Sequence, residues 1–236
     1  MLTNDQLAAF AKELVEAAEQ ENIVLRALGG IAIFIVSPSI ATHPTLQRSF
    51  KDVDFVAAHK HFDALVELFA AHGAVLRSRE HLQIKFDKEG NEIELSDTNF
   101  REDYSLDLSP RLKLTSSTLP LSDLLLIKLQ RKQFHEKDIQ DSIGLLLDHR
   151  VAREESEEQI SHAYIAQLTR ADWGRFHTVY DNTITLESIF PKYLEPEEAQ
   201  LVWRRIELIQ GEMDRQPKSV GWMVRQFARK PSQVPR

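Results

Sequence analysis

Two acidic side chains, Asp52 and Asp54, stand two residues apart in a run of β-branched and aromatic neighbours. Side chains alternate between the faces of a strand, so a strand here turns both carboxylates one way and Val53 and Phe55 towards the core. Mg²⁺ prefers oxygen ligands and is commonly held by one or two carboxylates together with substrate phosphates. The pair therefore predicts a divalent-cation site for phosphate chemistry, against the alternative of two solvated acids at a strand end.

A third carboxylate comes from a predicted hairpin, whose second strand covers residues 92–96. Ile93 and Leu95 face one side of this strand, and Glu92 and Glu94 face the other. Glu94, which has an apolar residue on each side, can supply a third carboxylate beside Asp52 and Asp54. Glu92 remains the alternative.

Two glycines, Gly29 and Gly30, follow a short β-prone run at 23–28 and precede an apolar run at 31–36. This pattern predicts a strand, a glycine turn and a short buried helix. Glycine lets backbone N–H groups approach a phosphate, and the N-terminus of a helix favours negative charge. The alternative is an ordinary turn.

A basic side chain, Lys128, lies within the apolar run 124–129, which predicts a helix. Its ammonium either reaches phosphates as a point charge or extends to solvent. Asp138 and Asp141 are three residues apart and so share one helical face. Three roles stay open for this pair: to orient Lys128, to bind the acceptor, or to cap and solvate the helix.

The elements that position these residues are predicted from hydrophobic periodicity. The first half alternates strands and helices, whereas the second half is helical, so we predict an α/β (α+β) fold with a mixed sheet in a domain at 1–118 and a helical domain at 119–236. Thr3 and Gln6 form a capping box for the first helix. Helices are predicted at 4–21, 61–72, 124–134 with Ser122 as cap, 138–149, 158–169, 172–181, 195–214 and 219–228. Strands are predicted at 52–57, 74–77 and 83–87. We also predict a loop at 39–50, an extended irregular segment at 99–118, and a solvated helix face at the acidic run 154–158.

Composition limits the classes of function. The 236 residues are 42% hydrophobic and 28% charged, with a net charge of −7 and no cysteine, which is typical of a folded globular protein without disulfides. No run approaches the roughly 18 apolar residues of a membrane span, and the N-terminus lacks the order of a secretory signal, so we expect a cytoplasmic protein with no membrane partner. The negative charge disfavours general nucleic-acid binding.

The motifs occur in a defined order: Leu28-Gly29-Gly30, Arg48 with Lys51-Asp52-Val53-Asp54, Ile93-Glu94-Leu95, Leu124 to Leu129, and Lys137-Asp138-Ile139-Gln140-Asp141. Over residues 20–150 this order resembles the nucleotidyltransferase superfamily, whose fold is that of DNA polymerase beta, and within it the AbiEii-like branch. Many members of the superfamily have serine at the second position of this turn, whereas this chain has Gly30 there, and other AbiEii-like sequences also have glycine.

The resemblance implies a Mg²⁺-dependent enzyme, with two ions, that transfers an NMP moiety from an NTP to an acceptor. The implied metal ligands are Asp52, Asp54 and Glu94, which with Lys128 form the catalytic set. The implied nucleotide-binding residues are Gly29, Gly30, Arg48, Lys128 and Asp138. Asp141 is assigned a structural role.

The acceptor stays open among a tRNA end, a protein hydroxyl and a small molecule, and toxin members of the branch favour the first two and an antitoxin partner. Two other functions also stay open. One is a catalytically silent binding or regulatory module with the same fold. The other is an RNA-binding protein that uses the basic C-terminal segment 215–236, in which Trp222 and Phe227 are interleaved.

Overall fold

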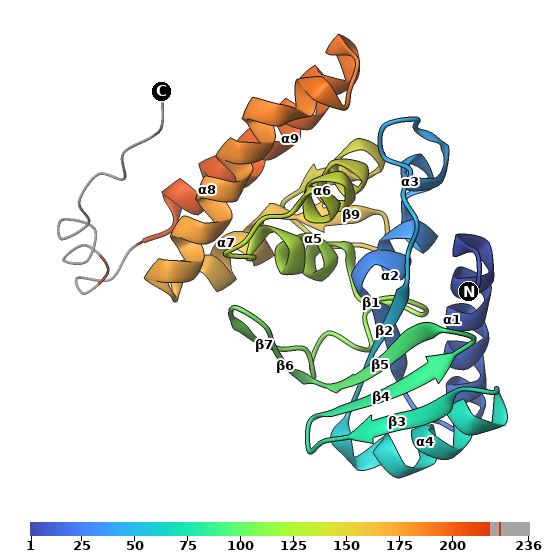
Figure 1. Ribbon diagram of the computed structural model, residues 1–236. Helices are drawn as coiled ribbons and strands as arrows, with labels where there is room; N and C mark the ends of the chain where they lie inside the picture. The colour runs from blue at the N-terminus through green and yellow to red at the C-terminus, as the bar shows by residue number, and fades with distance from the viewer. Residues whose placement is uncertain (218–221, 223–236) are drawn as a thin grey trace.

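The computed structural model describes residues 1–217 and 222, and it contains a mixed five-stranded sheet followed by helices (Figure 1). The α/β (α+β) fold class with a mixed sheet is therefore confirmed. The boundary between residues 118 and 119 stays a prediction. The sheet has the order β1-β2-β5-β4-β3, with strands β1 Leu25–Leu28, β2 Asp52–Ala57, β3 Val75–Arg79, β4 Gln83–Lys88 and β5 Asn91–Asp97.

The central pair of the sheet, β2 and β5, is parallel, whereas every other pair is antiparallel. Strands β4 and β5 form the predicted hairpin. Its turn residues, Glu89 and Gly90, both have positive φ (53° and 84°), which matches the right-handed twist of the strands. The turn sets the pairing Lys88–Asn91 and, three residues on, Lys85–Glu94.

One face of the sheet is apolar and covered by helices α1 (Asn4–Gln20) and α4 (Phe62–Ala71). The α4 side chain Phe69 contacts Phe55 of β2 and Phe86 of β4, with ring centroids 5.3 and 5.0 Å apart. Because these apolar residues alternate with the acids along the strands, the opposite face of β2 and β5 carries the carboxylates. In Figure 1 that part of the sheet lies below the later helices.

The chain returns from the sheet to the helices through a short hairpin, β6 (Asn99–Arg101) and β7 (Ser105–Asp107). The later elements are α5 Leu121–Leu129, α6 Glu136–Asp148, β8 Arg150–Ala152, β9 Gln159–Ser161, α7 His162–Arg170, α8 Trp173–Ile189, η2 Phe190–Lys192 and α9 Pro196–Arg215. The start of α5 is held by a buried cluster in which Asp123 accepts from Arg111 (2.8 Å) and from the Tyr164 hydroxyl (2.5 Å).

Three local predictions were wrong. The predicted loop 39–50 contains a short helix, α3 (Pro38–Thr42), which begins at a proline whose fixed φ suits a first helical turn. Ser122 does not cap α5, since its hydroxyl accepts from the Ser161 backbone N–H (2.7 Å) and Pro120 occupies the cap position. The acidic run 154–158 connects β8 to β9 and is not helical.

The first part of the chain also contains α2 (Gly29–Val36) and the short helix η1 (His59–His61). The predicted helix at 219–228 and most of the basic segment lie outside the described residues. Within that segment, the Trp222 ring contacts Phe176 and His177 of α8. None of the helices in the described ranges is both long enough and apolar enough to cross a membrane.

Candidate functional site

Four carboxylates lie together because β2 and β5 are parallel and in register. Asp52 pairs with Glu92, and Asp54 pairs with Glu94. Directly paired residues of neighbouring strands project to the same face of the sheet. The two aspartates of β2 therefore lie beside the two glutamates of β5. All four line one cavity of about 360 Å³.

The same cavity contains every residue to which the sequence assigned a role in metal or nucleotide binding. Its wall consists of Leu28, Gly29, Gly30, Arg48, Ser49, Lys51, Asp52, Asp54, Glu92, Glu94, Phe100, Glu102, Ile127, Lys128, Arg131, Lys137 and Asp138. These residues come from the β1–α2 junction, the sheet, the β6–β7 hairpin and helices α5 and α6. They also come from the segment 48–51 just before β2, which we call the strap. Residues separated by more than a hundred positions therefore share one wall.

Asp54 is the carboxylate with the strongest electrostatic perturbation. Burial, followed by the negative charges of Asp52 and Glu94, raises the pKa of Asp54 to about 7. Among the described residues its carboxylate accepts no hydrogen bond and forms no ion pair. An acid that is crowded by like charges and lacks a partner is a group that a cation would stabilise.

The glycine pair lies against the acids and the basic strap. Gly29 has a φ of +71°, and a Cβ on it would lie 2.1 Å from Oδ2 of Asp54. A Cβ on Gly30 would lie 2.7 Å from both Nη2 of Arg48 and the Phe50 ring. These close approaches leave room for hydrogen alone at both positions, so the two glycines allow the start of α2 to reach the cavity wall.

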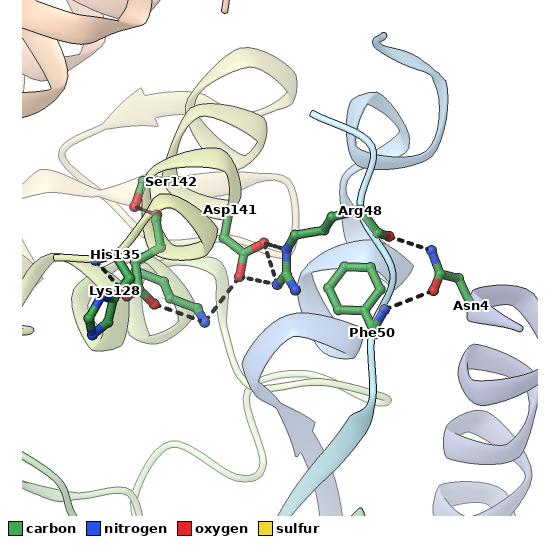
Figure 2. A network of polar contacts seen from close by, with 8 residues as sticks. Asn4, Arg48, Phe50, Lys128, His135, Asp141 and Ser142 are labelled. Carbon is green, nitrogen blue, oxygen red and sulfur yellow. Dashed lines mark hydrogen bonds and ion pairs between the residues drawn. The ribbon is translucent and has the colours of Figure 1, made fainter. Parts of the chain in front are cut away.

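A buried ion network joins the strap before β2 to helices α5 and α6 (Figure 2). Nη2 of Arg48 lies 2.8 Å from both carboxylate oxygens of Asp141, and Nζ of Lys128 lies 3.0 Å from Oδ2 of the same residue. Asp141 is fully buried. Asp141 thus holds the side chains of two basic residues of the cavity wall, Arg48 and Lys128. This contact specifies the structural role that the sequence assigned to Asp141 only in general terms.

The network is anchored at both ends. Asn4 of α1 donates to the Arg48 carbonyl (2.8 Å) and accepts from the Phe50 N–H (3.0 Å), so it fixes the strap on both sides of Ser49 (Figure 2). At the other end, Asp138 caps α6 by accepting from the His135 N–H (3.2 Å), and its second oxygen lies 3.5 Å from Nζ of Lys128. Asp138 therefore combines the capping and orienting roles that the sequence left open.

Lys128 is charged despite its burial. Burial lowers the pKa of Lys128, but the charges of Asp141 and Asp138 outweigh it and leave this pKa above its ordinary value. Its ammonium belongs to the cavity wall and does not extend to bulk solvent, so the snorkelling alternative is wrong.

Four further charged residues of the wall had no role assigned from the sequence. Lys51 and Lys137 form no ion pair within the described part of the chain, so they leave uncompensated positive charge at the cavity. Both lie inside the quoted motifs, next to Asp52 and Asp138, which is the signal that identifies them. Glu102 pairs with Arg131 across the cavity wall. Glu102 lies in the segment predicted as irregular, where no periodicity marks it.

The acids are assembled without forming a ready metal centre. Among the described residues, no three His, Asp or Glu side chains converge closely enough to hold a metal ion. Asp52, Asp54 and either glutamate nevertheless offer the hard oxygen donors that Mg²⁺ prefers, on one face of one cavity. The chemistry of this donor set therefore fits a divalent cation.

No protein-family model matches the sequence, and no curated protein sequence matches it. Among solved structures, the chain is similar to ANT(2″)-Ia in complex with adenylyl-2″-tobramycin, with 10% identity over 94% of this chain and 99% of that chain and a TM-score of 0.37. It is similar to an antigenic nucleotidyltransferase-like protein from Paracoccidioides brasiliensis, with 16% identity over 85% and 94% of the two chains and a TM-score of 0.44.

A third similar structure is a tRNA nucleotidyltransferase complexed with a primer tRNA and an incoming ATP analog, with 14% identity over 91% of this chain and 66% of that chain and a TM-score of 0.30. All of these identities and TM-scores are low. The proposals below therefore rest on the geometry of the site and on the sequence resemblance.

Proposed function

We propose that the protein is a Mg²⁺-dependent nucleotidyltransferase that moves an NMP moiety from an NTP to an acceptor hydroxyl. The observation that carries the proposal is the parallel register of β2 and β5, which brings Asp52, Asp54 and Glu94 into one cavity with the glycine start of α2. In the reaction, an acceptor oxygen bonds to the α-phosphorus, the bond from that phosphorus to the bridging oxygen breaks, and pyrophosphate leaves.

The fit of the acids to a divalent cation supports the metal dependence. Asp52, Asp54 and Glu94 would hold the ions, and the raised pKa of Asp54 reflects its burial together with the negative charges of Asp52 and Glu94. Bound Mg²⁺ supplies neutralisation of charge on phosphoryl oxygens. Two ions are our proposal from the sequence resemblance.

The basic residues of the cavity serve to bind and orient the triphosphate. Arg48 and Lys128 are fixed by Asp141, so they keep their positions without a ligand, but their charge is largely compensated. Lys51 and Lys137 form no ion pair with other described residues, so their ammonium groups are available to the triphosphate. Gly29 and Gly30 bring the N-terminus of α2 to the same wall, where its backbone N–H groups favour anions.

The acceptor and the cellular setting are proposed on the sequence resemblance alone. We retain the AbiEii-like branch, and with it a toxin–antitoxin role in the cytoplasm, an antitoxin partner, and a tRNA end or a protein hydroxyl as acceptor. A small-molecule hydroxyl is the other candidate.

The proposal is tested by incubating the protein with each α-labelled NTP, Mg²⁺ and a cell extract, and identifying the macromolecule or small molecule that carries the label. Asp54→Asn should abolish labelling. Asp63→Asn, which removes an exposed acid on the helical side of the sheet, should label as the wild type does. Calorimetry of NTP binding with and without Mg²⁺ completes the test.

The two rival functions predict different results. Mg²⁺-dependent NTP binding with no labelled product indicates a silent binding module. Steeply salt-dependent RNA binding that survives Asp52→Ala, without NTP binding, indicates an RNA-binding protein.

A further inference from the structure

A lysine of the neighbouring strand occupies the space between the two glutamates of the site. Lys85 of β4 pairs with Glu94 of β5 in the antiparallel register, so both side chains project to the acidic face. Its Nζ lies 2.9 Å from Oε1 of Glu92 and 3.5 Å from Oε2 of Glu94. One ammonium thus neutralises both candidates for the third metal ligand.

Glu94 is held at its other oxygen as well. The Ser96 hydroxyl donates to Oε1 of Glu94 (3.2 Å), so both oxygens of this carboxylate have partners within the sheet. Asp52 and Asp54, by contrast, form neither hydrogen bonds nor ion pairs with other described residues. The two strands of the proposed metal site are therefore in different states: the β2 acids are unpaired and the β5 acids are paired.

This difference concerns the position at which a third metal ligand would lie. The backbone register already places Asp54 opposite Glu94. The Glu94 carboxylate is nevertheless engaged by Lys85 and Ser96 of the sheet. For Glu94 to bind a cation through the oxygen that Lys85 contacts, its ion pair with Lys85 must break.

We propose that Lys85 is the resident counter-ion of the third-ligand position, which a divalent cation must displace before Glu94 joins Asp52 and Asp54. The inference rests on the proposed function, since it concerns the same cation site. In the absence of the cation, the ammonium of Lys85 limits repulsion among the acids. When a cation binds, the ammonium becomes a like charge a few ångströms from it.

The side chain of Lys85 is suited to such displacement. About one third of it is exposed (35%), and its four-carbon stem lets the ammonium move to solvent while the stem stays on the sheet. A lysine ammonium is charged at neutral pH. Removal of this charge should therefore strengthen cation binding at every working pH.

The test measures Mn²⁺ affinity from the electron paramagnetic resonance signal of free Mn²⁺, with Mg²⁺ as competitor and no nucleotide present. Mn²⁺ accepts the same oxygen ligands as Mg²⁺. We expect Lys85→Met to bind Mn²⁺ on the order of tenfold more tightly, the scale of one unit charge a few ångströms away in a solvated site. Lys85→Arg keeps the charge and should bind as the wild type does.

Lys60→Met is the matched control, because it removes one exposed lysine charge from η1, outside the cavity wall. It should leave Mn²⁺ affinity unchanged. Lys85→Gln repeats the test with a polar side chain, and the urea midpoint of each variant verifies that it is folded. Unchanged or weaker Mn²⁺ binding in both Lys85→Met and Lys85→Gln overturns the inference.

Asp54→Asn separates this inference from the proposed function. If the wild type binds Mn²⁺ and Asp54→Asn does not, the cation site stands, and the Lys85 variants alone decide the role of Lys85. If neither the wild type nor Lys85→Met binds Mn²⁺, both the site and the inference fail.

Discussion

Arg48 and Asp141, 93 residues apart in the sequence, form a two-pronged ion pair at the cavity wall. Asp141 is fully buried, and it also contacts the ammonium of Lys128. One carboxylate therefore holds two cations from different segments in fixed positions. The pair joins the strap that precedes the metal strand to the helical part of the chain.

We expect Asp141→Asn to lower the free energy of unfolding by about 3 kcal/mol, because it leaves the buried Lys128 and the partly buried Arg48 with less compensation. Urea denaturation at pH 7.5 measures this. Asp63→Asn breaks the exposed Asp63–Arg79 pair and should cost less than about 1 kcal/mol. Similar losses in the two variants would show that the buried network has no special weight.

Gly29→Ala should be more damaging than Gly90→Ala, although both residues have positive φ. Left-handed backbone strain costs an alanine about 1–2 kcal/mol at either position. A Cβ at Gly90 has its nearest neighbour at 3.6 Å, whereas a Cβ at Gly29 would displace the Asp54 carboxylate. We therefore expect Gly29→Ala to lose Mn²⁺ binding as well as stability, and Gly90→Ala to lose only stability. Mn²⁺ titration and urea denaturation of both variants check this, and intact Mn²⁺ binding in Gly29→Ala contradicts it.

The raised pKa of Asp54 predicts a pH-dependent effect of Asp54→Asn. The folded-state pKa is about 7, against an ordinary value of 3.8, so between about pH 4 and pH 7 the folded protein binds a proton that the unfolded chain has released. The stability of the wild type therefore falls as pH rises through this window. The amide that replaces the carboxylate in the variant does not titrate.

The free energy of unfolding of Asp54→Asn relative to the wild type should thus increase by about 2 kcal/mol from pH 4 to pH 8. This figure is smaller than the full pKa shift implies, because the carboxylate lines a cavity and is partly solvated. Urea midpoints in EDTA at the two pH values measure the difference. A parallel pH dependence in both proteins would mean that Asp54 titrates normally.

The choice between Glu92 and Glu94 is decided by comparing Glu92→Gln with Glu94→Gln. Glu94 pairs with Asp54 and is the less exposed of the two, with side-chain exposures of 21% against 54%. We expect Glu94→Gln to weaken Mn²⁺ binding about tenfold or more, and Glu92→Gln to change it less than about threefold. The reason is that a carboxylate that binds the ion directly contributes more to affinity than a charge that acts on the ion from a distance. A larger effect of Glu92→Gln would reverse the assignment.

Local features of the fold were predictable because they depend on short-range periodicity. The alternation of acids and apolar residues at Asp52 to Phe55 predicted β2 with the boundaries that the structure has. The capping box of Thr3 and Gln6 predicted the start of α1. The hairpin register could also have been extended from its two-residue turn to Lys85 and Glu94, which is the available signal for Lys85.

Short helices and caps were less predictable, since tertiary contacts compete with local preference. Ser122 is a good capping residue by type, but its hydroxyl serves the backbone of Ser161. The acidic run at 154–158 has helical composition, but it connects two strands that pair in parallel. In both cases contacts outside the segment itself compete with its local preference.

The sequence by itself determined which side chains share a face within one element: Asp52 with Asp54, Glu92 with Glu94, and Asp138 with Asp141. Only the tertiary structure decided that Asp54 lies opposite Glu94 and that Asp141 holds Arg48 and Lys128. The physical reason is that the repeats of strand and helix are properties of the local backbone and are visible in the order of residues. The register between strands and the pairing of buried charges depend instead on how the apolar faces of separate segments pack together.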